Sequence, residues 1–265
     1  MKTTTRILQG ANVVAFLAMI VVNTLATMTG LFGRQTGALS DAIPNLFVPA
    51  GVTFSVWGVL YLLILLFTVY QARGLFGAAG SAPEALGRVG WLFVVSSAAN
   101  VGWLLLWHAQ LVGLSMIPML ALLVTLIAVH VRLGTGRTRP TGAERWFFRV
   151  PFSAYLGWIT VATIANATAA LVTADWNGFG LAPEVWAVAM VVVAALVTLV
   201  MLLTRRDAAY SLVVVWALAG IALKRSADAS AASQAVYVAA IACAAVVAAA
   251  IVATAIRGAL RPLKN

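Results

Sequence analysis

The chain has 265 residues, of which 63% are hydrophobic and only 9% are charged, and its formal net charge is +10 at pH 7. An ordinary soluble domain has about 25% charged residues, so this composition excludes a water-soluble enzyme. Apolar runs of about 18 residues or more are long enough to cross a hydrocarbon core of roughly 30 Å. Several such runs are present, and they predict an all-α integral membrane protein.

Eight apolar runs predict about eight transmembrane helices. In chain order they cover residues 11–30, 51–71, 90–107, 114–131, 151–173, 186–203, 208–223 and 231–256. The run at 208–223 is the shortest, since at 1.5 Å per residue it spans only about 24 Å. It would need a thinned bilayer or a partial crossing. The segments 31–50 and 72–89 are two long connections between the runs.

The basic residues fall mainly on alternate connections. With a cytoplasmic N-terminus, fourteen of them lie on inner segments and three on outer segments. The inner ones are Lys2, Arg6, Arg73, Arg88, Arg132, Arg137, Arg139, Arg145, Arg149, Arg205, Arg206, Arg257, Arg261 and Lys264, and the outer ones are Arg34, Lys224 and Arg225. This asymmetry predicts that both termini are cytoplasmic. It accounts for the basic charge without nucleic acid as a partner, and the Arg-rich segment 132–149 is a candidate for contact with anionic lipid.

The start of the chain and its one cysteine bear on location and redox chemistry. Lys2 and Arg6 precede an apolar stretch, as in a signal peptide, but this stretch is longer than a typical signal h-region. We therefore expect a retained first helix and an integral protein of the bacterial plasma (inner) membrane. Cys243 lies inside the last run, so the sequence offers no disulfide framework and no cysteine-based metal site.

Ionisable groups are missing from the predicted membrane interior, because none of the eight runs contains Asp, Glu, Lys or Arg. A charge at the bilayer centre costs roughly 2.5 to 3.5 kcal/mol on insertion scales, so such groups usually mark proton relays and intramembrane catalysts. We predict no catalytic residue, no metal site and no required cofactor. His108 is interpreted as an interfacial polar cap, with contact to a ligand or a haem iron as the alternative, and His130 has no second ligand at metal spacing.

Polar and aromatic residues suggest a pocket in the outer half of the membrane. Asn23, Trp57, Asn100 and Asn166 each lie about seven residues from the outer end of their run, or roughly 10 Å deep. Further aromatic residues lie at helical spacing from these on the same helices, so they share a helix face with them. The candidate ligand-binding residues are Asn23, Trp57, Tyr61, Asn100, Trp103, Trp107, Tyr155, Trp158 and Asn166. Such faces suit a flat, largely apolar ligand beneath the 31–50 segment. The alternative is that the amides join helices and the tryptophans pack or form an interfacial belt.

Three ordered motifs resemble a known family. The stretch VPAGVTFSVWGVLYLL at 48–63 is similar to the second-helix signature of the TspO/MBR family, the translocator proteins or tryptophan-rich sensory proteins. ANVGW at 99–103 resembles its third-helix Leu-Asn-x-x-Trp, and VPFSAYLGWITVATIAN at 150–166 resembles its fifth-helix motif. The motifs lie within residues 11–173. The sequence departs from the family pattern in three places. Pro49 is a single proline where the family has two, Leu104 follows Trp103 where the family commonly has a serine, and the fifth helix lacks the aromatic ending of the family.

The resemblance implies a TspO-like five-helix bundle over residues 1–180, followed by three additional transmembrane helices over 181–265. It also implies a pocket that the loop after the first helix covers. The ligands that the resemblance implies are porphyrins and other tetrapyrroles, haem included, and in some members sterols or synthetic aromatic molecules. Trp57, Asn100, Trp103, Tyr155, Trp158 and Asn166 would line or support this pocket. Arg34 is a candidate partner for a ligand carboxylate.

Several functions stay open at this point. The leading hypothesis is a sensory or binding protein for a planar hydrophobic ligand such as a porphyrin, acting without turnover. The alternatives are a transporter of tetrapyrroles or other hydrophobic small molecules, a ligand-degrading catalyst, and a structural or assembly partner that binds no ligand. The Ala-rich last helices have small-xxx-small spacing, which permits a homodimer as well as packing within one chain.

Overall fold

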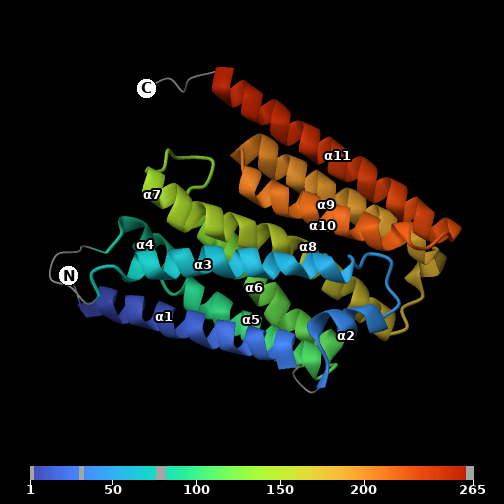
Figure 1. Cartoon of the computed structure of the whole chain (residues 1–265), viewed down its shortest axis with the longest axis horizontal. Helices are drawn as coiled ribbons and strands as arrows, with labels where there is room; N and C mark the ends of the chain where they lie inside the picture. Colours follow the sequence, from blue (N-terminus) through green and yellow to red (C-terminus); the bar gives the residue numbers. More distant parts are fainter. Residues whose placement is uncertain (1–2, 30–32, 76–81, 261–265) are drawn as a thin grey trace.

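The computed structural model describes residues 3–29, 33–75 and 82–260, and these residues form helices and connections without a strand. Eight long helices make up the fold. They are α1 (Thr3–Thr24), α3 (Val56–Ala72), α5 (Leu92–His108), α6 (Val112–Arg132), α8 (Val150–Thr173), α9 (Pro183–Arg205), α10 (Ala208–Ser226) and α11 (Ala231–Leu260). The start of α1 and the end of α11 lie at the same end of the bundle (Figure 1). We call this the inner end, because the charge pattern of the sequence predicts that it faces the cytoplasm.

Short helical segments join the long helices. They are η1 (Leu25–Thr29), α2 (Thr36–Ala42), η3 (Gly51–Ser55), α4 (Glu84–Val89), α7 (Gly142–Glu144), η4 (Arg145–Arg149) and η5 (Gly178–Gly180). The predicted loop at 31–50 therefore contains a helix, α2. This helix lies across the outer ends of the first helices (Figure 1).

The lengths of the helices agree with a membrane protein but differ in one detail from the sequence pattern. Seven helices in the described part of the chain are long and apolar enough to span a bilayer, and α5, with 17 residues, is slightly shorter. The run expected to be shortest, 208–223, is the 19-residue helix α10. It continues to Ser226, with Lys224 and Arg225 in its last turn, where positive charge favours a helix C-terminus. Helix α5 is short because Gly90, at φ +54°, separates it from α4.

The long helices form two layers. Helices α1, α3, α5, α6 and α8 surround a common core, and α9, α10 and α11 pack together on one side of it (Figure 1). Helix α10 joins the layers by packing on α8. A Cβ atom added to Gly157 would lie 2.6 Å from the backbone oxygen of Tyr210. The close approach of the two backbones therefore requires glycine at this position.

A buried carboxylate also joins the layers near the inner end. Asp207 is the N-cap of α10, and its side chain accepts a hydrogen bond from the Tyr210 backbone N–H at 3.2 Å. Ser153 of α8 donates to the same carboxylate at 2.6 Å, and His130 Nδ1 of α6 lies 3.5 Å from it. All four residues are buried. Asp207 lies between two of the predicted runs, so the sequence did not reveal its burial among three helices.

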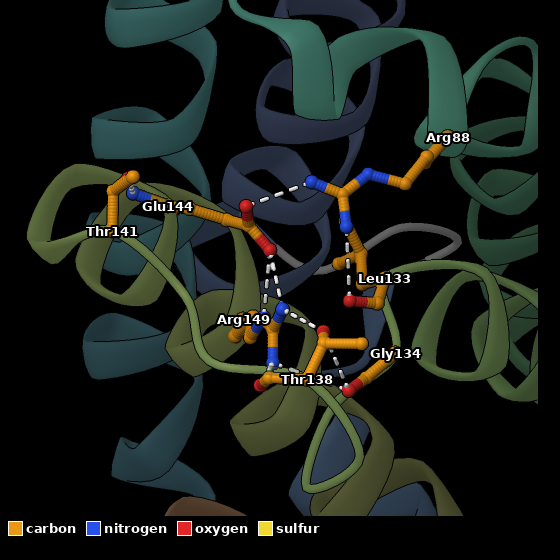
Figure 2. A network of polar contacts seen from close by, with 7 residues as sticks. All are labelled: Arg88, Leu133, Gly134, Thr138, Thr141, Glu144 and Arg149. Atoms are coloured by element: carbon orange, nitrogen blue, oxygen red, sulfur yellow. Dashed lines mark hydrogen bonds and ion pairs between the residues drawn. The ribbon is translucent and has the colours of Figure 1, made fainter. Parts of the chain in front are cut away.

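Figure 2 shows a network of polar contacts that orders the inner loops. Glu144 accepts hydrogen bonds from Arg88 at 2.7 Å and from Arg149 at 2.6 and 2.8 Å. The Arg149 guanidinium also donates to the backbone oxygens of Gly134 and Thr138, at 3.2 and 2.7 Å. Arg149 is 5% exposed, so one arginine of the Arg-rich segment 132–149 serves the fold.

Candidate ligand-binding pocket

Four tryptophans from three helices surround a cavity in the outer half of the bundle. Trp57 comes from α3, Trp103 and Trp107 come from α5, and Trp158 comes from α8. The remaining lining residues are Thr36, Ser40, Val48, Pro49, Phe54, Val161, Ala162, Ala165, Asn166 and Ala169. Thr36, Ser40, Val48 and Pro49 belong to residues 33–50, which we call the lid. Small alanines on α8 leave the space that the tryptophan rings surround.

The aromatic rings contact one another in fixed arrangements. Trp57 meets Trp158 edge to face, with ring centroids 6.0 Å apart and planes at 79°. Trp103 and Trp107 are stacked, with centroids 6.2 Å apart and planes at 28°. Phe54 completes the edge-to-face set on Trp158 at 5.9 Å. Both arrangements are preferred for aromatic pairs, so the pocket wall is organised before any ligand enters.

Asn166 holds the orientation of one tryptophan ring. Its Oδ1 accepts a hydrogen bond from Trp103 Nε1 at 3.1 Å and another from Ser115 Oγ at 3.2 Å. Its Nδ2 donates to Met116 Sδ at 2.8 Å. Asn166 therefore lines the pocket with an amide that is already saturated, and it fixes the orientation of the Trp103 ring.

Two indole groups in the pocket have no acceptor. The Nε1 atoms of Trp107 and Trp158 are buried and have no hydrogen-bond partner among the residues that the structure describes. These two side chains are 6% and 3% exposed. Leaving a buried donor unpaired costs about 1 to 3 kcal/mol. The pocket walls are therefore largely apolar and include two indole donors without acceptors.

The other candidate residues form a separate hydrogen-bonded chain. Asn23 Nδ2 donates to Asn100 Oδ1 at 2.7 Å, and Asn100 Nδ2 donates to the Tyr155 hydroxyl at 3.0 Å. The Tyr61 hydroxyl donates to Asn23 Oδ1. This polar chain crosses α3, α1, α5 and α8, and none of its four members is among the described residues that line the cavity. It meets the pocket through Trp57, which stacks on Tyr61 and touches Tyr155 edge-on.

Contacts with three helices hold the lid closed. Thr36 Oγ1 lies 2.9 Å from His108 Nε2 at the outer end of α5, and Asn45 donates to Thr168 of α8 at 2.6 Å. Lys224 of α10 forms an ion pair with a lid carboxylate, Asp41. The lid also ends on α10, where the Ala50 backbone N–H donates to the Gly220 oxygen at 2.9 Å. One of the C-terminal helices thus contributes directly to the cover of the pocket.

Residues 7–253 match the sequence model of the TSPO-like protein family. The chain belongs to this family. No curated protein and no solved structure matches it significantly. The matched region includes α9, α10 and most of α11, so it extends well beyond residues 11–173, where the three motifs lie. The TSPO-like chain is an all-helical integral membrane protein.

Tertiary contacts add residues that the motifs of this TSPO-like chain did not indicate. Ser115 and Met116 of α6 contact the Asn166 amide, and Thr36 and Asn45 hold the lid. Ser115, Met116 and Thr36 have small or weakly polar side chains, and Asn45 lies outside the predicted helices, so their spacing in the sequence carries no signal. His108, interpreted as an interfacial cap, is 2% exposed and lies against the lid.

Proposed function

We propose that this TSPO-like protein binds a planar, largely apolar molecule of the tetrapyrrole class and signals by occupancy, without turnover. The observation that carries the proposal is the pair of unpartnered indole donors, Trp107 and Trp158, in a cavity walled by four tryptophans. Aromatic walls stack on a flat ring system, and the two donors suit acceptor atoms at its edge. This combination favours a heteroaromatic ring system over a sterol, whose rings are not aromatic and which carries a single hydroxyl group.

Binding requires the lid to move. The space open to the centres of water molecules in the cavity is about 50 Å³, which is enough for a few waters but not for a four-ring molecule. The walls on α3, α5 and α8 belong to long helices of the bundle, whereas the lid is a connection between helices. It is held by its buried residues Leu39, Phe47 and Val48, by a few polar contacts and by an ion pair. We therefore assign the opening step to the lid.

The proposal is tested by titrating purified protein in detergent with protoporphyrin IX and following the shift of the porphyrin absorption band. Trp158→Ala removes a wall and a donor of the pocket, whereas Trp91→Ala removes a half-exposed tryptophan at the inner end of α5. We expect saturable binding that weakens about tenfold or more in Trp158→Ala and is unchanged in Trp91→Ala. Equal effects of the two substitutions, or binding that does not saturate, would refute a ligand in this pocket.

A further inference from the structure

A second cavity lies next to the tryptophan pocket at its outer end. It is lined by Arg34, Leu39, Ala42 and Ile43 of the lid and by Trp107, Gln110, Val112 and Thr173 at the outer ends of the helices. The space open to the centres of water molecules there is about 190 Å³, so it holds several waters. Trp107 lines both cavities and forms a wall between them.

The outer cavity is suited to an anion. Arg34 brings a guanidinium group and Gln110 brings an amide donor to its wall. No Asp or Glu is among the described residues that line this cavity, and the lid carboxylate of Asp41 already pairs with Lys224. In the described part of the chain, Arg34 forms no ion pair. A guanidinium with neighbouring neutral donors is a common recognition site for carboxylates.

The two cavities follow one another along α8. The wall of the tryptophan pocket extends from Trp158 to Ala169, and Thr173 lines the outer cavity one turn further out. At 1.5 Å per residue, the part of α8 that lines the pocket is about 16 Å long, and Thr173 lies about 6 Å beyond it. An apolar ring system therefore belongs in the inner position. A charged group belongs in the outer position, where contact with water and with Arg34 lowers the free-energy cost of placing a charge in the protein.

We propose that the outer cavity binds a carboxylate substituent of the ligand through Arg34 and the Gln110 amide. This inference rests on the proposed function and narrows it to planar apolar acids. Arg34 selects the acid over its neutral derivatives, and the tryptophan pocket holds the ring system of both. The two parts of the site thus make separable contributions to affinity.

The test compares protoporphyrin IX with its dimethyl ester, which keeps the ring system and lacks the negative charges. We expect the wild-type protein to bind the acid at least about fivefold more tightly than the ester, the ratio expected for a partly exposed charge pair. Arg34→Gln lowers this ratio to near one by weakening only the acid. Arg225→Gln is the matched control, because it removes the other outer-side arginine, on α10 and away from both cavities.

Ionic strength supplies a second readout. Higher salt screens a partly exposed pair, so it lowers the acid-to-ester ratio of the wild type and leaves that of Arg34→Gln unchanged. Both probes enter the same micelles in every variant, so differences in partitioning cancel when the ratios are compared. Saturable binding of both probes with equal affinity, or a ratio that Arg34→Gln does not lower, would overturn the carboxylate site and leave the pocket intact. If neither probe saturates, the proposed function itself fails.

Discussion

The polar chain that crosses four helices makes a quantitative prediction about Asn100. This residue is completely buried, and its amide forms two contacts between helices, to Asn23 at 2.7 Å and to Tyr155 at 3.0 Å. Hydrogen bonds between membrane helices average about 0.6 kcal/mol and reach about 1.7 kcal/mol. Asn100→Leu keeps most of the side-chain volume and removes both bonds. We therefore expect it to lower the free energy of unfolding by about 1.2 to 3.4 kcal/mol.

Asn12 provides the matched control. It is also completely buried, but its amide nitrogen and oxygen have no hydrogen-bond partner among the described residues. Asn12→Leu removes two unpaired polar atoms, so we expect the protein to be as stable as the wild type or more stable. Unfolding in mixed micelles with increasing SDS, followed by circular dichroism, measures both variants.

The same pair of variants separates stability from ligand binding. Asn100 lies outside the pocket and reaches it through the contacts of Trp57 with Tyr61 and Tyr155. Asn100→Leu should therefore change the stability more than it changes the affinity for protoporphyrin IX. Equal destabilisation by the two Leu substitutions would show that the hydrogen bonds of the polar chain do not stabilise the packing of the helices. A loss of affinity larger than that of Trp158→Ala would show that Asn100 contacts the ligand directly.

Three further predictions concern the C-terminal layer. Gly157→Ala places a methyl group 2.6 Å from the Tyr210 backbone oxygen. It should destabilise the protein by about 1 to 3 kcal/mol and lower the melting temperature. Gly10→Ala is the control, because the space around Gly10 is open, and it should not lower the melting temperature. Asp207→Ala removes a helix cap and a charge-assisted hydrogen bond and should cost about 2 kcal/mol or more in the same SDS unfolding assay; an unchanged transition would contradict this role. Lys224→Gln removes the ion pair with the lid and should speed protoporphyrin binding in stopped-flow measurements by up to about fivefold, and an unchanged association rate would separate this pair from lid opening.

The sequence by itself determined the class of protein and the number of long helices, and it predicts their direction through the membrane. These features depend on the length of apolar runs and on the side on which arginines fall, and both are local properties of the chain. The three motifs also indicated the TSPO-like family, because each keeps its order and its helix. The aromatic faces on three helices were visible as spacings of three and four residues.

The tertiary structure decided how the nine candidate residues divide. Trp57, Trp103, Trp107, Trp158 and Asn166 line the cavity, and Asn23, Tyr61, Asn100 and Tyr155 form the polar chain. Depth in the membrane can be estimated from the sequence, but the rotation of each helix about its axis cannot. That rotation follows from side chains packing across helices, and it determines which groups find partners and which face a cavity.

The role of the last three helices was also decided only by the folded chain. Their composition is largely alanine, valine and leucine, which indicates membrane burial but no particular neighbour. In the structure, Gly220 and Lys224 of α10 contact the lid, and Asp207 joins α10 to α8. Each of these contacts joins residues more than fifty positions apart in the chain. Local sequence patterns carry no information about such pairs. They come together because α8 and α10 pack closely at Gly157 and because the buried Asp207 carboxylate joins the two helices.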